Sequence, residues 1–308
     1  MLSVIIPAYN EEVMIESAYS EIKKVLSGEG IAFEAVFVDD GSKDGTWDKI
    51  DTVSRANPEV RGIRFSRNFG KEAAIMAGLS ECVGECAVVI DCDLQHPPEK
   101  IVDMYRMWQE GYEVIEGKKK GRQKEGLLHS VFAKIFYSVI SKATGVDMTN
   151  ASDFKLLDRK AIDVLVNMRE KNAFFRALSS WIGFRTASVE FEVRDRAAGR
   201  SKWSSAALTR YAINNVSSFS TAPMQLVTVF GVIVFIISVV LGIIALVQKL
   251  SGAALEGFTT VILIQLFSAS ITMMSLGIIG YYIARIYEEI KGRPRYIISE
   301  KCGEEKDR

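Results

Sequence analysis

Two long stretches without a charged residue constrain this chain more than any other feature of its sequence. Residues 226–247 contain no charged side chain, and at about 22 residues they are long enough to cross a hydrocarbon layer of roughly 30 Å as a helix. Residues 258–284 form a second such stretch, in which Gln265 is the only strongly polar member. A core helix of a soluble protein seldom reaches this length without a charge. We therefore expect two membrane-spanning helices, at about 226–248 and 258–284.

The charges of the chain lie mostly outside these two stretches, and their distribution predicts a topology. The whole chain balances 38 basic residues against 38 acidic residues, which gives no general field for binding nucleic acid. Residues 248–257, between the apolar stretches, carry one Lys and one Glu, whereas residues 285–308 carry seven basic side chains. Because basic segments stay in the cytoplasm, we expect an integral inner-membrane protein with both termini on the cytoplasmic side.

The N-terminal part alternates apolar, strand-like runs with polar loops and helix-like segments. The apolar runs lie at residues 3–7, 33–38, 60–65 and 87–90. Strand, polar loop and helix repeat about every 30 residues, as in successive βαβ units. This pattern predicts an α/β fold with a doubly wound, mostly parallel sheet. The expected domains are a cytoplasmic domain at 1–200, interfacial helices at 201–225, two transmembrane helices within 226–284 and a cytoplasmic tail at 285–308.

Pairs of acidic residues directly follow two of the predicted strands. Asp39 and Asp40 follow the second strand, and Asp91 and Asp93 follow the fourth, with Gln95 close behind. Open α/β sheets bind their ligands at the carboxyl ends of parallel strands. If the backbone stays extended, Asp91 and Asp93 point the same way, and carboxylates this close repel each other unless a cation lies between them. Hard oxygen ligands suit Mg²⁺ or Mn²⁺; the alternative is a solvated turn with two helix-capping acids.

The loops after the predicted strands match a known set of motifs. No glycine-rich phosphate loop follows the first strand, so a dinucleotide site is not indicated. Instead the chain carries, in order, Val4-Ile5-Ile6-Pro7-Ala8-Tyr9-Asn10-Glu11, Val38-Asp39-Asp40-Gly41-Ser42, Ser66-Arg67-Asn68-Phe69-Gly70 and Asp91-Cys92-Asp93-Leu94-Gln95. Together these resemble the second glycosyltransferase family, and more narrowly its polyprenyl-phosphate group of dolichol-phosphate mannose synthases and bactoprenol glucosyltransferases. The likeness covers the whole chain, because the bactoprenol branch also ends in two membrane spans.

This resemblance implies a nucleotide-sugar-binding, A-type glycosyltransferase fold and assigns roles to residues of the motifs. The donor would be held by Pro7, Tyr9, Glu11, Asp40, Asp91 and Cys92. The ion, Mg²⁺ or Mn²⁺, would be surrounded by Asp91, Asp93 and Gln95, with Asp93 also counted as catalytic. The family commonly has alanine in place of Cys92, and we expect this thiol only to pack. Lys71 stands where relatives often carry histidine, so the resemblance gives it no role.

One acid and several basic residues are the candidates for the acceptor side. By the same resemblance Asp153 faces the acceptor and is the second catalytic residue, and the neighbouring Lys155 replaces the usual arginine. Phosphates of the donor or the lipid would be held by Lys119, Arg122, Arg196 and Lys202. A charge run such as residues 116–125 is equally typical of a solvated surface, and basic residues near a membrane can merely contact anionic lipid. Asp158 is expected to cap a helix that begins at Arg159.

The predicted activity is metal-dependent, inverting transfer of one sugar from a nucleotide diphosphate sugar to polyprenyl (undecaprenyl) phosphate at the cytoplasmic membrane face. The bactoprenol likeness favours a UDP-hexose as the donor. The second pKa of a phosphate monoester is about 6, so the acceptor needs no strong base and Asp153 is predicted to orient it. The alternatives are a GDP-mannose-dependent mannose synthase and a non-catalytic, membrane-anchored nucleotide-sugar scaffold or sensor. Small residues in the apolar stretches would permit a homo-oligomer.

Overall fold

A computed structural model of the chain describes residues 1–120, 152–168, 170, 174–194, 222–251 and 257–303. The chain divides into two compact units, one formed by Met1–Asn215 with Pro294–Arg308 and the other by Val216–Arg293. Three of the expected phosphate ligands, Arg122, Arg196 and Lys202, lie outside the described residues, as does most of the expected interfacial segment 201–225.

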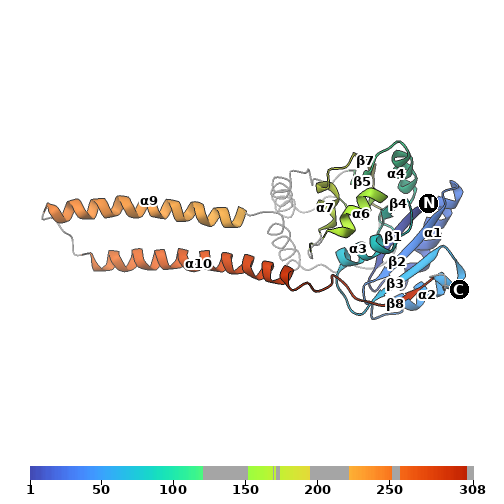
Figure 1. Cartoon of the computed structure of the whole chain (residues 1–308), viewed down its shortest axis with the longest axis horizontal. Coiled ribbons are helices and arrows are strands. Elements are labelled where there is room, and N and C mark those ends of the chain that lie inside the picture. Colours follow the sequence, from blue (N-terminus) through green and yellow to red (C-terminus); the bar gives the residue numbers. More distant parts are fainter. Residues whose placement is uncertain (121–151, 169, 171–173, 195–221, 252–256, 304–308) are drawn as a thin grey trace. The chain divides into compact units, whose positions relative to one another are not determined.

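The first unit is built on one eight-stranded mixed sheet with the strand order β7-β5-β6-β4-β1-β2-β3-β8 (Figure 1). Its strands are β1 (Leu2–Ala8), β2 (Phe33–Asp39), β3 (Val60–Phe65), β4 (Cys86–Val89), β5 (Val114–Lys119), β6 (Lys155–Asp158), β7 (Thr186–Phe191) and β8 (Ile298–Cys302). The central strands β4, β1, β2 and β3 are parallel, as the sequence predicts, and β7 runs parallel to β5. Antiparallel pairs join β6 to β4 and β5, and β8 to β3. The predicted α/β class and parallel centre are confirmed, and antiparallel strands extend the sheet on both sides.

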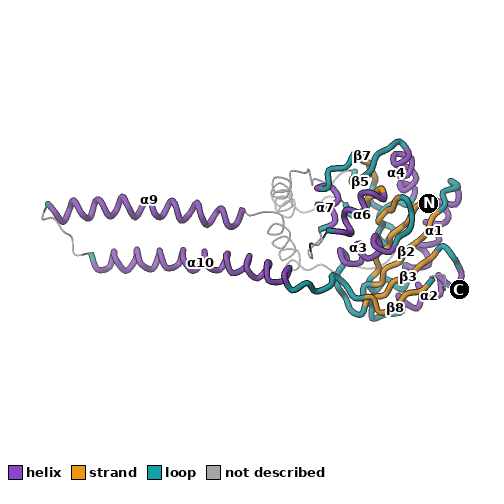
Figure 2. The backbone as a smooth tube through the Cα atoms, viewed as in Figure 1, coloured by secondary structure: helices purple, strands orange, loops and turns teal. Residues whose placement is uncertain are grey.

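Helices cover both faces of this sheet (Figure 2). One face carries α1 (Ile15–Gly28), α2 (Thr46–Ala56) and α4 (Glu99–Gln109), and the other carries α3 (Lys71–Glu81), α6 (Arg159–Asn167) and α7 (Phe175–Trp181). The predicted cap of α6 is confirmed, because the Asp158 carboxylate accepts a hydrogen bond of 2.9 Å from the Lys160 N–H. Such a cap satisfies one of the backbone donors left free in the first turn of a helix.

Strand β1 shows how its sequence separates the two faces. Val4 and Ile6 pack into the core on the side of α1, α2 and α4, whereas Ile5 points to the opposite side, because neighbouring strand residues alternate. On that opposite side α3 lies so close to the sheet that a Cβ atom on Gly78 would collide with the Ile5 side chain. The four parallel strands therefore sit in a tight two-sided core, and the loops after them emerge along one common edge.

Strand β8 joins the C-terminal part of the chain to the eight-stranded sheet. It pairs antiparallel with β3, and its Glu300 carboxylate accepts hydrogen bonds from Trp47 Nε1 at 3.0 Å and Arg64 Nη1 at 2.8 Å. Just before it, Tyr296 stacks on Phe65 with 5.1 Å between the ring centroids. Part of the segment expected to be a tail therefore belongs to the folded domain. The sequence pattern did not indicate this strand.

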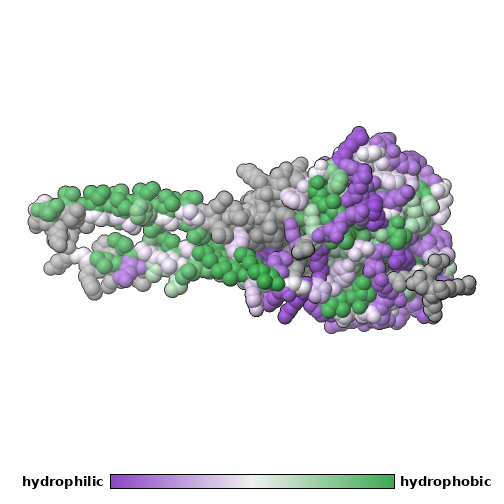
Figure 3. Space-filling model, viewed as in Figure 1, coloured by the Kyte–Doolittle hydropathy of each residue, from purple (hydrophilic) through white to green (hydrophobic). Residues whose placement is uncertain are grey.

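Two long helices make up the described part of the second unit. They are α9 (Ala222–Leu250) and α10 (Phe258–Ile290), and each extends beyond its predicted bounds. Both are long and apolar enough to cross a membrane, with candidate spans at Val227–Ile244 and Phe267–Ile290. Their large apolar side chains face outward, so the helix surfaces are mostly hydrophobic (Figure 3). Apolar surface of this extent is typical of a protein that contacts lipid.

Candidate active site

Hydrogen bonds connect the loops after β1 and β2 at the carboxyl edge of the sheet. The Asn10 N–H donates to Ser42 Oγ at 2.8 Å, and the Glu11 N–H donates to Thr46 Oγ1 at 2.9 Å. In return the Lys43 N–H donates to Asn10 Oδ1 at 2.9 Å. Asn10 has a φ of 54°, a left-handed conformation that asparagine tolerates better than most residues. These bonds fix the backbone that carries three expected donor ligands, Pro7, Tyr9 and Glu11, whose roles stay a prediction.

Asp40 ties the end of β2 to the loop before α3. Its buried carboxylate accepts hydrogen bonds from the Phe69 N–H at 2.6 Å and from the Gly70 N–H at 3.0 Å. Burial raises the pKa of Asp40 to about 6, although these two bonds favour its ionised form. Gly70 adopts a φ of 100°, which favours glycine and turns the chain into α3. Asp40 thus positions the first residue of α3, Lys71, and its predicted contact with the donor remains untested.

The acidic loop after β4 is not extended, so the condition under which Asp91 and Asp93 were expected to point the same way is not met. The strand ends at Val89, and the chain turns at Cys92 and Asp93. Leu94 has a φ of 55°, which is strained for a residue with a large side chain, and such strain is concentrated at functional sites. The Gln95 N–H closes the turn by donating to Asp93 Oδ1 at 3.1 Å. Cys92 is buried beneath this turn, and burial raises the pKa of its thiol, in agreement with a packing role.

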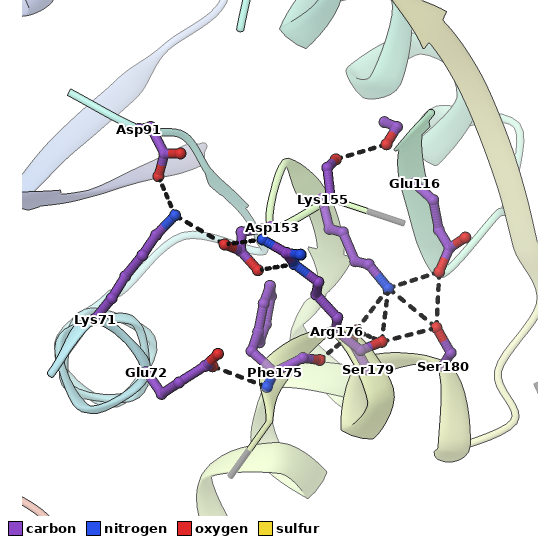
Figure 4. A network of polar contacts seen from close by, with 12 residues as sticks. Lys71, Glu72, Asp91, Glu116, Asp153, Lys155, Phe175, Arg176, Ser179 and Ser180 are labelled. Carbon is purple, nitrogen blue, oxygen red and sulfur yellow. Dashed lines mark hydrogen bonds and ion pairs between the residues drawn. The ribbon is translucent and has the colours of Figure 1, made fainter. Parts of the chain in front are cut away.

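A lysine bridges the two acids that the sequence assigns to different halves of the site. Lys71 Nζ lies 2.5 Å from Asp91 Oδ1 and 2.8 Å from Asp153 Oδ2 (Figure 4). Arg176 on α7 holds the other side of Asp153, with Nε at 2.6 Å from Oδ1 and Nη2 at 2.9 Å from Oδ2. Burial opposes the ionisation of Asp153, but Lys71 and Arg176 outweigh it and hold the pKa of this carboxyl well below its ordinary value. The structure therefore joins Asp91 and Asp153 into one charged centre.

His96 lies against this centre. Its Nδ1 is 3.9 Å from Asp91 Oδ2, and no hydrogen-bond partner is found for this buried nitrogen in the part of the chain that the structure describes. The ring stacks on Phe154 at 5.1 Å between centroids and meets Phe191 edge-on at 5.2 Å. Burial lowers the pKa of His96 and so favours the neutral ring. A buried polar atom left unpaired beside a carboxylate is the kind of position that a ligand or water completes.

Lys119 is the only expected phosphate ligand that falls within the described residues. It is the last residue of β5, and desolvation together with the nearby charge of Arg176 lowers its pKa. The same electrostatic neighbourhood includes Asp91, Asp153 and Lys71. Lys119 therefore adds a positive charge close to the two carboxylates, and basic side chains in such a position suit phosphate groups. The position of Lys119 agrees with its predicted role but does not test it.

A second ion pair lies buried beneath the centre and supports α7. Lys155, which has no exposed surface, donates to Glu116 Oε1 at 2.6 Å and to the hydroxyls of Ser179 at 2.9 Å and Ser180 at 3.0 Å. Ser180 also donates to Glu116 Oε1 at 2.7 Å. Lys155 thereby connects β5 and β6 to the helix that presents Arg176. The lysine that departs from the usual motif is satisfied here by four oxygen acceptors, which include the Arg176 carbonyl at 3.1 Å.

Glu72 holds the other end of α7. Its Oε2 accepts a hydrogen bond of 2.9 Å from the N–H of Phe175, the first residue of that helix. Burial and the nearby charge of Asp153 raise the pKa of Glu72 to about 7, although this bond and the charges of Arg176 and Lys71 act in the opposite direction. α7 is thus fixed at its start by α3 and along its length by Lys155, so the orientation of Arg176 is set from both sides.

The sequence analysis did not identify Arg176, Glu72 or Glu116 as parts of the site. None of them belongs to a motif that follows a predicted strand, and Arg176 comes from a short helix outside the motifs that carry the resemblance. The one available signal is the composition of residues 174–178, in which Arg176 is a single charge between apolar neighbours. A lone arginine in an apolar segment needs a partner when it is buried. The sequence does not say which acid provides it.

Replacing Lys155 with methionine is expected to destabilise the protein by about 3–5 kcal/mol, because Glu116 is left as a buried charge without its partner. With roughly 2–4 °C of melting temperature per kcal/mol for a domain of this size, the melting point of the detergent-solubilised protein should fall by about 6–20 °C. The double variant Glu116→Gln, Lys155→Met should lose less stability than the single variant, because no uncompensated buried charge remains.

Lys49→Met is the matched control for this stability prediction. Lys49 forms an ion pair of similar length, 2.8 Å to Glu16 Oε1, but both members of this pair are exposed to solvent. Exposed pairs contribute little, so its loss should leave the melting curve unchanged. If Lys155→Met melts within the error of Lys49→Met, the buried pair does not support the fold in the way described here.

The donor atoms of the acidic loop fit a divalent metal that is shared with a bound diphosphate. Within the described residues no group of three or more His, Cys, Asp or Glu side chains is arranged to hold a metal by itself. Asp91, Asp93 and Gln95 offer two carboxylates and an amide, and Mg²⁺ sites commonly combine one or two carboxylates with substrate phosphates and water. The unpaired Nδ1 of His96 beside Asp91 also indicates that this position is incomplete without a ligand.

A sheet with a parallel centre, continued by antiparallel strands and carrying an acidic loop after β4, is the architecture of A-type glycosyltransferases. Glucosyl-3-phosphoglycerate synthase from Mycobacterium tuberculosis, solved in complex with Mn²⁺, UDP and its product, has the same fold. The two structures align with a TM-score of 0.50 and 21% sequence identity over 71% of this chain and 79% of that one. This similarity concerns the fold alone.

Sequence comparison then places the chain in a family. The model of glycosyl transferase family 2 matches residues 3–165, more than half of the chain. An uncharacterized glycosyltransferase of Bacillus subtilis, YkcC, is 37% identical over 99% of this chain and 95% of its own length. The SfII prophage-derived bactoprenol glucosyl transferase of Shigella flexneri is 34% identical over 97% of both chains. The chain belongs to glycosyl transferase family 2 and is a glycosyltransferase.

Proposed function

We propose that this enzyme transfers a single hexose from a UDP-sugar to undecaprenyl phosphate or a similar polyprenyl phosphate at the cytoplasmic face of the inner membrane. The observation that carries the proposal is the extent of the similarity to bactoprenol glucosyl transferase, which covers 97% of both chains. It therefore includes α9 and α10 as well as the sheet. A relative that shared only the donor-binding half would carry no information about the acceptor. Similarity across the apolar helices supports an acceptor that is itself a membrane lipid.

The pairing of β8 supports a topology with both termini on one side of the membrane. The chain leaves the catalytic sheet before α9 and returns to the same sheet after α10, as β8. A chain that leaves and re-enters one folded unit in this way crosses a membrane an even number of times. Two spans meet this condition, and the basic residues of 285–308 favour the cytoplasm for both ends.

The acidic loop is the proposed site of the metal and the donor diphosphate. Asp91, Asp93 and Gln95 would hold Mg²⁺ or Mn²⁺ together with diphosphate oxygens. When bound, such an ion neutralises the charge of the departing nucleoside diphosphate, which then needs no proton. Pro7 lies near the end of β1, and Tyr9, Glu11 and Asp40 lie on the loops after β1 and β2 at the same sheet edge, where these residues would contact the base and ribose.

The cations around Asp153 are the proposed site of the acceptor phosphate. Lys119 and Arg176 carry positive charge next to this carboxylate, and the predicted ligands Arg122, Arg196 and Lys202 would add to it. Holding two mutually repelling phosphates in reacting geometry is a large part of the catalysis of such a transfer. Asp153 orients these cations and is itself a poor nucleophile, because Lys71 and Arg176 engage both of its oxygens. This arrangement supports a single displacement by the acceptor phosphate, with inversion at the sugar.

The purified, detergent-solubilised enzyme tests this proposal directly. It is incubated with undecaprenyl phosphate and, in turn, UDP-glucose, UDP-galactose, UDP-N-acetylglucosamine and GDP-mannose, and the lipid products are analysed by mass spectrometry. We expect a monoglycosylated lipid from a UDP-hexose in the presence of Mg²⁺ or Mn²⁺ and none after treatment with EDTA. Product from GDP-mannose alone would make the enzyme a mannose synthase. Nucleotide binding without any glycolipid would favour a scaffold or sensor. Activity in the presence of EDTA would contradict the proposed metal dependence.

A further inference from the structure

Lys71 contacts the carboxylate of Asp91, which is one of the proposed metal ligands. We propose that the Lys71 ammonium is a resident counter-ion of Asp91, and that a divalent cation arriving with the donor diphosphate takes its place there while Lys71 keeps its bond to Asp153. The inference rests on the proposed metal site and adds to it a residue that controls when the metal binds. It follows from the distances of 2.5 Å to Asp91 Oδ1 and 2.8 Å to Asp153 Oδ2.

Without a cation between them, the two carboxylates would repel each other. Asp153 is almost completely buried and Asp91 is partly buried, so water screens their charges poorly. Lys71 bridges them and satisfies both. Arg176 binds Asp153 through two further hydrogen bonds, so Asp153 stays neutralised whatever Lys71 does. Within the described part of the chain Asp91 has no comparable second partner, because His96 Nδ1 is 3.9 Å away. Asp91 is therefore the end of the bridge that can exchange its cation.

An ammonium and a divalent metal compete at one carboxylate. Even on neighbouring oxygen atoms of Asp91 they would lie a few ångströms apart, where a single and a double positive charge repel strongly. Lys71 can withdraw, because its side chain is 41% exposed and reaches the acids from the first turn of α3 by a flexible four-carbon stem. The diphosphate supplies the compensating charge that makes the exchange favourable. The expected consequence is that metal alone binds weakly and that metal with nucleotide binds well.

Metal binding by the full-length protein tests this inference without any measurement of catalysis. The fraction of free Mn²⁺ is followed by electron paramagnetic resonance as Mn²⁺ is titrated into the detergent-solubilised protein, with and without UDP. For Lys71→Met we expect the dissociation constant for Mn²⁺ alone to fall by about tenfold or more, since the competing charge is gone. Lys71→Gln is the second neutral variant and should behave alike. Lys71→Arg keeps the charge and should bind Mn²⁺ alone as weakly as the wild type.

The controls separate this inference from the proposed function. Lys49→Met removes an exposed, ion-paired lysine from the surface and should leave Mn²⁺ binding unchanged. If the wild type binds Mn²⁺ in the presence of UDP but neither neutral Lys71 variant gains affinity for Mn²⁺ alone, Lys71 does not compete with the metal and the inference is wrong. If no variant binds Mn²⁺ even with UDP, the metal site itself is wrong and the inference falls with it. Melting curves show that each variant is folded.

Discussion

Replacing Asp93 with alanine is expected to reduce sugar transfer by at least about 10³-fold, which corresponds to roughly 4 kcal/mol of transition-state stabilisation. Asp93 offers a carboxylate on the turn after β4, next to Asp91 and Gln95, where the donor diphosphate and its metal are proposed to bind. Loss of this ligand removes charge stabilisation from the leaving group. The substitution should leave the fold intact, because the side chain is partly exposed and its bond to the Gln95 N–H is a short-range contact within the turn.

Activity and folding are measured on the same preparation. Initial rates come from the glycolipid assay at saturating donor, and the melting temperature of each variant reports its fold. Asp103→Ala is the matched control: this aspartate lies on α4 and pairs at 2.7 Å with Lys100, and its loss should affect neither quantity. An Asp93→Ala enzyme that keeps more than about a tenth of the wild-type rate would exclude Asp93 from the metal site.

The central part of the fold could be predicted from the sequence because it is made of local repeats. Each parallel strand is an apolar run followed by a polar loop and a helix, and right-handed connections then leave few topologies. Strand β8 could not be predicted in this way. It pairs with β3 across more than 200 residues of chain, and its sequence, Ile-Ser-Glu-Lys-Cys, places three polar or charged residues between its two apolar ends, so it does not read as an apolar run. Its stability comes from Trp47 and Arg64, which bind Glu300.

The candidate site likewise contains residues that the sequence indicated and residues that it did not. Asp40, Asp91 and Asp93 could be identified from the sequence, since each directly follows a strand whose end lies at the binding edge. The conformation of the acidic loop could not, because the left-handed Leu94 has no signal in the residue pattern. The partners of Asp153 also could not be predicted from the sequence. Arg176 comes from α7 and Lys71 from α3, and only the packing of these helices on one face of the sheet brings them to the same carboxylate.

Electrostatics links the departures of this chain from its family pattern. Lysine replaces arginine at position 155, and the buried Glu116 with two serine hydroxyls provides acceptors that suit a compact ammonium. Lysine also stands at position 71, where it reaches two carboxylates at once. Both lysines act on α7 or on its partner Asp153. The orientation of Arg176 thus depends on a connected set of charges. A change at one of these charges should alter the contacts of Asp153.

Replacing Asp153 with asparagine is expected to lower the turnover number by about 10²–10³-fold, because the amide cannot hold Lys71 and Arg176 as the carboxylate does. The pH dependence of this loss distinguishes an orienting group from a general base. The second pKa of the acceptor phosphate is about 6, so the rate of both enzymes should rise as the acceptor becomes a dianion. The cations hold the pKa of Asp153 well below its ordinary value, which makes it a weak base.

An orienting role predicts that the ratio of the rate with Asp153 to the rate of the Asp153→Asn variant stays constant between about pH 5.5 and 8 when both enzymes also carry Glu72→Gln, since the acceptor then ionises alike for both. The Glu72→Gln background is needed because the charge of Asp153 helps to raise the pKa of Glu72 to about 7. A general base predicts a ratio that grows as the pH falls, because only the enzyme that keeps Asp153 could remove the proton that the acceptor retains at low pH. Asp153→Glu keeps the charge but displaces it, and should lose rate through geometry alone, with the same constant ratio. A ratio that climbs steeply toward pH 5.5 would assign proton removal to Asp153, even though two cations engage its carboxylate.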